Sequence, residues 1–299
     1  MTDYLTTETG RRIAYDRLEG QGPGIVFLGG FRSDMQGSKA VHLRDWAAAQ
    51  GRAFLRFDYS GHGASDGVFE EGCIGDWAAD ARAAIEALTQ GPQVMVGSSM
   101  GGWISLLMAR TIPDRFAGLV TIAAAPDFTE RGFWAGFSPG QREALMRDGR
   151  VALPSEYGEP LVLTRRLIED GRDQLVLNQP LSLPFSARML QGTADADVPV
   201  SWRGSAADPG QGGRSPVLLA RLSGPDRRDD RGDRSERQGI VVAHVGLVAG
   251  DLGFGDLVQE SHAAAGGPNL RLGQVKAQQL DVGVLLAILK PAGGDCVPQ

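Results

Sequence analysis

The sequence has few cysteines and no long apolar run. Its 299 residues include only two cysteines, Cys73 and Cys296. Two cysteines cannot form a disulfide framework or a cysteine-based zinc site, so we expect a protein of a reducing compartment. No stretch reaches the roughly 18 apolar residues that a membrane span needs, and the polar start MTDYLTTETG lacks the features of a signal peptide. We therefore expect a soluble, unprocessed, cytoplasmic protein without a membrane span.

An excess of basic residues is also missing. Lys and Arg number 30 against 36 Asp and Glu, which gives a net charge of −6. This balance argues against a nucleic-acid partner or a surface that seeks anionic lipid, and it favours small or neutral partners. The sequence contains no phosphate loop, no dinucleotide-binding glycine pattern and no metal-ligand spacing, so it predicts neither a cofactor nor a metal site.

The first 125 residues alternate short apolar runs with longer amphipathic ones. This rhythm is typical of a mostly parallel sheet flanked by helices, so we expect an α/β fold. One helix is predicted to open at Asp76, with apolar residues at helical spacing up to Leu88. Another, WISLLMAR at 103–110, stops before Pro113. The predicted strands are residues 25–30, 53–60, 93–99 and 119–125.

The pattern changes after Pro126. Residues 127–184 show helix-like apolar spacing and no clear strand, so we expect a helical insertion over the sheet, followed by a strand at 186–192. We therefore divide the chain into a core at 1–202 that carries this insertion, an irregular linker rich in Arg, Gly and Asp at 203–239, and a C-terminal segment at 240–299. Within that segment, 240–250 could be a strand and 282–289 a short helix or strand.

The strongest motif is VGSSMGGW, in which Gly97, Ser99 and Gly101 form G-x-S-x-G between a predicted strand and a predicted helix. A serine on such a tight turn projects its hydroxyl above the sheet, and only residues without side-chain bulk at 97 and 101 let the neighbouring backbone pass. The helix N-terminus places the Met100 N–H beside a reacting carbonyl. The alternative is a glycine-rich turn with an inert serine.

Two further loops fit a nucleophilic serine. Gly29 and Gly30 end the first core strand, so the Phe31 N–H could be a second donor to an oxyanion, although any tight turn uses two such glycines. In QGTADADVPV, Asp195 comes directly after a late strand, where a carboxylate would orient a base. Asp197 is its rival, and both could be turn residues.

Four blocks in order, FLGGFRSDMQGSKA, RFDYSGHGASDG, GPQVMVGSSMGGW and QGTADADVPVSW, resemble the α/β-hydrolase-fold palmitoyl-protein thioesterases that also cleave acyl glucuronides such as that of mycophenolic acid. The resemblance runs from about residue 10 to residue 202. It implies Ser99 as nucleophile, Asp195 as triad acid, the Phe31 and Met100 amides as oxyanion hole, and a helical cap. The family is mitochondrial in eukaryotes.

The chain departs from the family at the triad histidine. The loop where the family places it reads SGPDRRDD here. Among the four histidines of the chain, His42 is expected to have a surface or packing role on the first predicted helix, His62 to stabilise a turn, and His244 to be a buried structural residue. His262 keeps the order Ser, Asp, His and is a weak candidate for the base. The chain beyond residue 203 could also be an out-of-register or divergent continuation of the gene.

The sequence thus leaves two functions open. The first is a serine hydrolase of esters or thioesters, acting on a small-molecule or protein-linked acyl substrate through an acyl-serine intermediate. The second is a binding protein on a hydrolase scaffold that has lost its triad histidine, because loss of the base costs on the order of 10⁶ in turnover.

Overall fold

An eight-stranded sheet forms the centre of the protein. The computed structural model describes residues 2–154, 159–178, 181, 183–191 and 198, together with the backbone of 241–244. The strand order is β1-β2-β4-β3-β5-β6-β9-β10. The strands are β1 (Asp3–Thr6), β2 (Arg12–Leu18), β3 (Gln21–Leu28), β4 (Arg52–Phe57), β5 (Gln93–Ser98), β6 (Phe116–Ile122), β9 (Ala187–Gln191) and β10 (Val241–His244).

The sheet is parallel from β4 through β3, β5, β6 and β9 to β10, and antiparallel where β2 pairs with β1 and β4. Successive residues of β3 face opposite layers: Val26 and Leu28 join one apolar cluster, whereas Ile25 and Phe27 join the other. A strand buried on both faces must be apolar throughout, which is why the run was readable in the sequence. The predicted α/β class is confirmed. The two N-terminal strands were missed.

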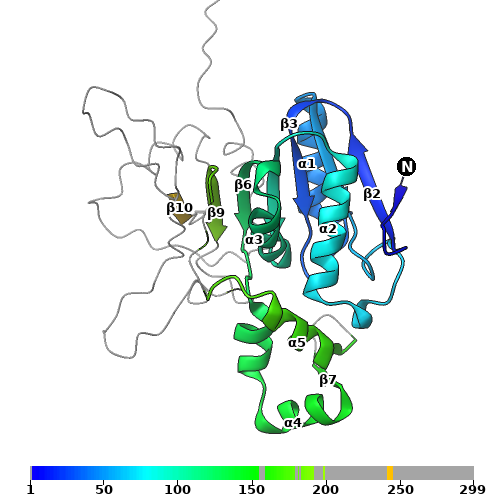
Figure 1. Cartoon of the computed structure of the whole chain (residues 1–299), viewed down its shortest axis with the longest axis vertical. Coiled ribbons are helices and arrows are strands. Elements are labelled where there is room, and N and C mark those ends of the chain that lie inside the picture. The colour runs from blue at the N-terminus through cyan, green and yellow to red at the C-terminus, as the bar shows by residue number, and fades with distance from the viewer. Residues whose placement is uncertain are drawn as a thin grey trace, which may run out of the picture.

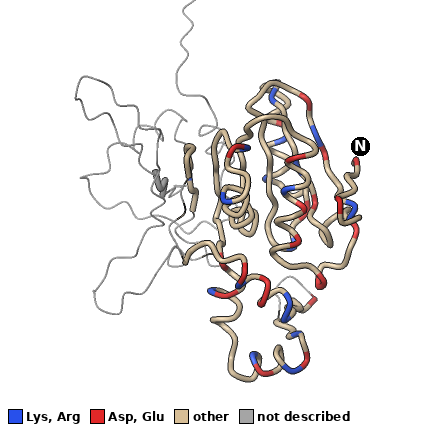
Figure 2. The backbone as a smooth tube through the Cα atoms, viewed as in Figure 1, with Lys and Arg blue, Asp and Glu red and all other residues tan. Residues whose placement is uncertain are grey.

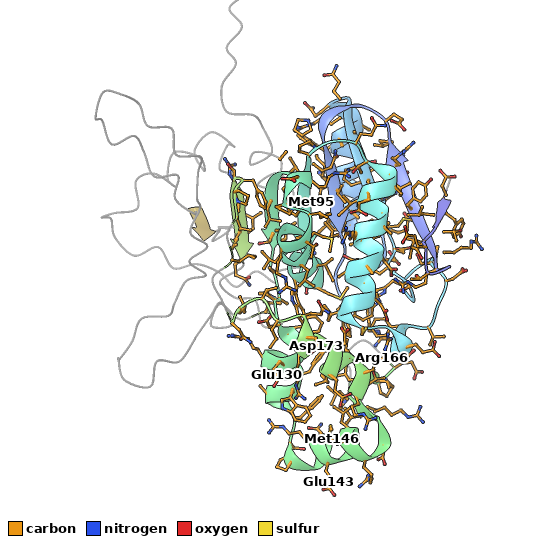
Figure 3. The ribbon with its side chains drawn as sticks, viewed as in Figure 1. Met95, Glu130, Glu143, Met146, Arg166 and Asp173 are labelled. Atoms are coloured by element: carbon orange, nitrogen blue, oxygen red, sulfur yellow. The ribbon has the colours of Figure 1, made fainter. Side chains whose placement is uncertain are left out.

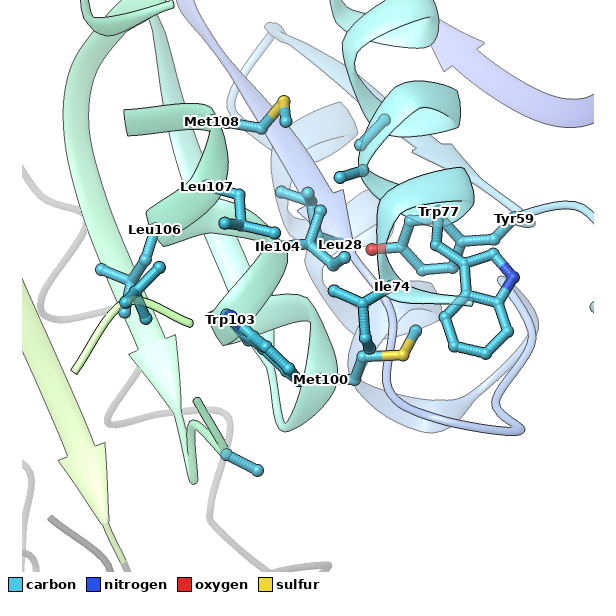
Figure 4. Close-up of a cluster of buried hydrophobic side chains, with 14 of the residues drawn as sticks. Leu28, Tyr59, Ile74, Trp77, Met100, Trp103, Ile104, Leu106, Leu107 and Met108 are labelled. Carbon is cyan, nitrogen blue, oxygen red and sulfur yellow. The ribbon is translucent and has the colours of Figure 1, made fainter. Parts of the chain in front are cut away.

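Helices cover both faces of the sheet (Figure 1). Helix α1 (Ser38–Ala49) packs on one face, and α2 (Ile74–Leu88) and α3 (Met100–Thr111) pack on the other. The two predicted helices correspond to α2 and α3. Figure 4 shows the cluster between α2, α3 and the sheet, in which Met100 lies near Ile74 and Trp77. A short 3-10 turn, η1 (Phe69–Glu71), precedes α2, and another, η2 (Pro113–Arg115), follows α3.

A cap of mixed structure follows β6 and lies below the sheet in Figure 1. It contains a π-helix, η3 (Thr129–Trp134), then α4 (Pro139–Asp148), β7 (Arg150–Leu153), β8 (Leu161–Thr164) and α5 (Arg165–Asp173). The expectation of no strand here is wrong, because β7 and β8 form an antiparallel pair. Each of these strands has only four residues, too few to show the alternation of apolar and polar residues that marks a strand in a sequence. Within the described residues, each strand also pairs only with the other in this two-stranded sheet.

Basic and acidic residues both lie along the cap (Figure 2). Arg172 on α5 forms an ion pair of 2.6 Å with Glu130 on η3, and its guanidinium lies 4.5 Å from the centroid of the Trp134 ring. Figure 3 shows three of the charged residues of the cap, Glu130, Arg166 and Asp173. These contacts join α5 to η3, so the two helices of the cap nearest the sheet are held together.

The predicted strand at 186–192 is β9, and part of the possible strand at 240–250 is β10, parallel to β9. The linker at 203–239 and the segment at 282–289 lie outside the described residues, and the division of the chain into domains stays a prediction. In the part of the chain that the structure describes, no helix combines the length and the apolar character that crossing a bilayer requires.

Candidate active site

Ser99 occupies a sharp turn between β5 and α3. Its backbone has φ 51° and ψ −114°, a conformation that residues with a side chain rarely adopt. Three hydrogen bonds hold it there. The Ser99 N–H donates to the Ile122 carbonyl at 2.9 Å, and the Ser99 carbonyl accepts from the N–H groups of Gly102 at 2.9 Å and Ala125 at 3.1 Å. The end of β6 therefore fixes the turn, and the conformational strain persists because its surroundings enforce it.

The glycines at 97 and 101 are required by space, as the motif predicted. A Cβ on Gly97 would overlap the Gly101 carbonyl, and a Cβ on Gly101 would overlap the Leu28 carbonyl at the end of β3. Helix α3 thus packs against β3 and β5 at a distance that only glycine allows. The Ser99 side chain is half-buried, and no described residue forms a hydrogen bond with its hydroxyl.

The loop after β3 passes directly beside Ser99. A Cβ added to Gly30 would lie 3.5 Å from the Ser99 Cβ. The loop turns tightly, since the Ser33 N–H donates to the Gly30 carbonyl at 3.1 Å. Within the described part of the chain, neither the Phe31 N–H nor the Met100 N–H donates to a protein acceptor. Two unoccupied backbone donors thus belong to the segments that adjoin the serine.

Aromatic rings enclose the Phe31 side chain. Its ring centroid lies 4.9 Å from that of Phe69, 5.3 Å from Phe128, 5.8 Å from Phe133 and 5.9 Å from Trp77. Three of these contacts are edge-to-face, the geometry that aromatic quadrupoles prefer. Phe133 comes from the π-helix of the cap, and π-helical turns are frequent at functional sites. An aromatic cluster, built partly from the cap, therefore surrounds the side chain that follows Gly30.

His62 does stabilise a turn, as the sequence suggested: its N–H donates to Tyr59 at 2.9 Å and its carbonyl accepts from Ser65 at 3.0 Å. Its ring does more than the sequence indicated. The Nε2 atom accepts a hydrogen bond of 3.3 Å from the Arg32 N–H, in the loop beside Ser99. Burial lowers the pKa of His62, while the carbonyl of Ser60 acts in the opposite direction.

Two buried carboxylates tie loops together near this edge. Asp58, after β4, accepts from the Met35 N–H at 2.6 Å and the Ala64 N–H at 2.9 Å. Asp127, after β6, accepts from the Val176 N–H at 2.9 Å and the Leu177 N–H at 3.0 Å. Burial raises the pKa of both carboxyl groups, and their backbone hydrogen bonds oppose that rise.

Sequence reasoning did not single out Asp58 or Asp127. The signal it could have used is an aspartate within a few residues of the end of an apolar strand, where backbone N–H groups of crossing loops need acceptors. Asp127 adopts φ 58° and Arg32 φ 57°, so both positions are strained in the way that Ser99 is.

The remaining candidate residues from the sequence are three histidines and two aspartates. Asp195, its rival Asp197 and the candidate base His262 lie outside the described residues. His244 ends β10, of which the structure describes only the backbone, and His42 is exposed on α1, as expected. The structure thus brings Ser99, Phe31 and Met100 together. In the described ranges, no group of three or more His, Cys, Asp or Glu is placed to hold a metal ion.

Comparison with known proteins agrees with this geometry. A model of the α/β-hydrolase fold matches residues 38–161. The chain is 36% identical over 189 residues to the mitochondrial palmitoyl-protein thioesterase ABHD10 of Rattus norvegicus, covering 62% of this chain and 63% of that one. The Homo sapiens protein of the same name is also 36% identical over 189 residues. The chain thus spans less than two thirds of the length of these curated relatives.

Two solved structures extend the comparison. The α/β-hydrolase domain-containing protein 10 from mouse has a TM-score of 0.62 and 33% identity, covering 67% of this chain and 80% of that one. The crystal structure of a hydrolase from Agrobacterium vitis S4 has a TM-score of 0.64 and 38% identity, covering 67% of this chain and 81% of that one. The expectation of a cytoplasmic location is wrong by these comparisons, because the rat, mouse and human relatives are mitochondrial proteins.

Proposed function

Because the chain belongs to the α/β-hydrolase family, we propose that it is a serine hydrolase that cleaves carboxylic esters or thioesters through an acyl-serine intermediate. The observation that carries this proposal is Ser99, held at φ 51° between β5 and α3 with its hydroxyl unpaired among the described residues. A structural serine would satisfy its hydroxyl locally, whereas a nucleophile must present it to a ligand.

In the proposed reaction, the Ser99 Oγ forms a bond to the acyl carbon as its proton passes to an imidazole base. The N–H groups of Phe31 and Met100 receive the negative charge that develops on the carbonyl oxygen. When the intermediate collapses, the C–S or C–O bond breaks and the leaving thiolate or alkoxide takes the proton from the imidazolium. Water then attacks the acyl-serine by the same steps, releasing the carboxylic acid and restoring Ser99.

The triad partners in this proposal come from the sequence. Asp195 orients the base, with Asp197 as the alternative, and His262 is the base that preserves the chain order Ser, Asp, His. The test is a pair of variants: His262→Ala abolishes turnover and His244→Ala does not. Full activity in His262→Ala would remove His262 from the mechanism.

The substrate class we propose is an apolar acyl group on a cysteine thiol, as in palmitoylated proteins, or on a glucuronide. The name of the rat relative supports the first, and the aromatic cluster around Phe31, in the loop that passes Ser99, supports an apolar acyl chain. We also propose that residues 1–202 form the hydrolase core, with the part at about 127–184 as its cap, followed by a linker at 203–239 and a C-terminal segment at 240–299 that would supply His262.

The decisive experiment compares the wild-type protein with Ser99→Ala on an activated short-chain ester and on an S-palmitoyl peptide. With a complete triad, Ser99→Ala lowers kcat by about 10⁶-fold. Ser38→Ala is the matched control, since Ser38 is exposed on α1, which packs on the face of the sheet opposite to α3. A fluorophosphonate probe labels the wild-type protein and not Ser99→Ala. Equal turnover in the wild-type protein and Ser99→Ala would discard the hydrolase proposal.

A second candidate is a binding protein on the same scaffold. It is favoured by the stretch SGPDRRDD, which has no histidine where the family carries its base. In that case S-palmitoyl peptide binds with equal affinity to the wild-type protein and Ser99→Ala, and neither hydrolyses it. Turnover that depends on Ser99 excludes this candidate.

A further inference from the structure

We propose that His62 is a positioning residue that locks the oxyanion loop, Gly29–Ser33, through the N–H of Arg32. The role rests on the proposed function, because the loop carries the Phe31 N–H that would receive the oxyanion. The loop follows β3, and His62 follows β4, the parallel neighbour of β3. Loops at the same ends of adjacent parallel strands meet, which is how residues 30 positions apart come into contact.

The hydrogen bonds of the ring determine its proton arrangement. The Arg32 N–H can only donate, so the His62 Nε2 at 3.3 Å must accept. The Ser60 carbonyl can only accept, so the Nδ1 at 3.2 Å must carry the proton and donate. His62 is therefore neutral and in one tautomer. Burial, which lowers its pKa, keeps it in that state at neutral pH.

The ring has little freedom to move. His62 is 4% exposed, and its centroid lies 5.1 Å from Phe69, 5.1 Å from Trp77 and 5.6 Å from Tyr59, each ring meeting it edge-on. The carbonyl that receives its Nδ1–H is itself fixed. Ser60 donates through its N–H, at 2.9 Å, and through its hydroxyl, at 2.6 Å, to the fully buried carboxylate of Asp80.

This chain of contacts ends in a salt bridge, since Arg11 on the other side of Asp80 donates to its carboxylate at 2.7 Å. The acceptor that faces the oxyanion loop is thus anchored on α2, through Asp80, and on Arg11, the residue before β2, and not on the loop itself. An anchor of this kind is preorganised, because it does not depend on the state of the substrate.

The loop needs such an anchor because its backbone is strained. Arg32 adopts φ 57°, which glycine accepts readily and a residue with a Cβ does not. Relaxation of Arg32 toward the usual region would rotate the peptide that links it to Phe31. The carboxylate of Asp58 holds the chain at Met35, four residues beyond Phe31. His62 holds it one residue beyond, so His62 controls the direction of the Phe31 N–H.

The test uses two variants of His62, each of which replaces one of the two ring nitrogens with a side-chain amide. His62→Asn places a polar atom near the Nδ1 position, which keeps a partner for Ser60 and removes the acceptor for Arg32. His62→Gln places its amide near the Nε2 position, which restores that acceptor. His42→Asn, at the exposed histidine of α1, is the control for the substitution itself.

The readouts are kcat and KM for an activated ester, and hydrogen exchange of a peptide covering residues 29–36. In His62→Asn we expect kcat to fall about 10- to 100-fold, with KM changed by less than about threefold, since the donor acts on the transition state. In His62→Gln we expect kcat within about fivefold of wild type, as rescue of the acceptor predicts. The loop peptide exchanges faster in His62→Asn alone, and a peptide from α1 reports any global loss of structure.

Two results would overturn the role of His62: equal kcat in the Asn and Gln variants, or loop exchange in His62→Asn that matches the wild-type protein. Failure of the proposed function looks different. If wild-type turnover equals that of Ser99→Ala, the protein is not a serine hydrolase of this ester, and the exchange measurement alone decides whether His62 locks the loop.

Discussion

The sharpest stability prediction concerns Asp127, where the chain leaves the sheet for the cap. Its side chain is completely buried, and its two carboxylate oxygens accept the N–H groups of Val176 and Leu177, where the chain returns. We predict that Asp127→Asn destabilises the protein. Asparagine keeps the shape of the side chain and tolerates φ 58°, so the change is confined to one oxygen and the charge.

The magnitude follows from the two hydrogen bonds. An asparagine offers one oxygen, so one of the two N–H groups faces an NH₂ and is left buried without an acceptor, which costs about 1–3 kcal/mol. At about 2–4 °C per kcal/mol for a domain of this size, we expect Tm to fall by about 2–12 °C. Asp127→Ala leaves both N–H groups without an acceptor, so its Tm falls further.

The assay is thermal unfolding followed by circular dichroism, with hydrogen exchange of a peptide covering residues 170–178 as the local measurement. Asp114→Asn, an exposed aspartate in η2, makes the same chemical change without a buried partner. If Asp127→Asn unfolds within about 1 °C of wild type, or if Asp114→Asn loses as much, the argument from buried acceptors is wrong.

The pH dependence provides a second check. Burial raises the pKa of Asp127 in the folded protein above its ordinary value of 3.8. A raised folded-state pKa means that the folded protein binds this proton more tightly, so the contribution of Asp127 to stability grows as pH falls through the folded-state pKa toward 3.8. The stability of wild type relative to Asp127→Asn therefore increases over that window. A difference that shrinks on acidification would contradict the sign.

Two further predictions concern packing and reactivity. Gly101→Ala forces a Cβ into the Leu28 carbonyl and destabilises the protein by about 1–3 kcal/mol, whereas Gly140→Ala, with open space in α4, stabilises it by about 0.5–1 kcal/mol in urea unfolding. Burial raises the pKa of Cys73 to about 12, so in a Cys296→Ser background a disulfide reagent at pH 8 reacts only after unfolding. Fast reaction of the native protein would contradict this.

The elements that the sequence revealed are those whose signal is local. Strand β3 has an unbroken apolar run that ends in two glycines, and the turn at Ser99 requires glycine on both sides whatever the rest of the chain does. Both constraints act within a few residues. The motif could therefore be placed without knowing the order of the strands.

The features that the sequence concealed depend on strand order or on very short segments. His62 could be assigned to a turn from SGHGAS, but its contact with Arg32 follows only once β3 and β4 are known to be parallel neighbours. The pair β7–β8 is too short to show periodicity. The triad acid stays a prediction, because Asp195 and Asp197 lie beyond the described residues.

The hydrogen bonds of Asp127 hold the two ends of the cap together, and this affects how the cap can change during evolution. The outgoing and returning chains meet at one carboxylate, so the intervening residues form an insert whose two ends are fixed relative to the sheet. Loop-closure entropy grows slowly with length, and an insert anchored in this way tolerates exchange for one of another size. Under the function proposed above, substrate preference can then evolve by replacing this insert, while Ser99 and its neighbours keep their positions.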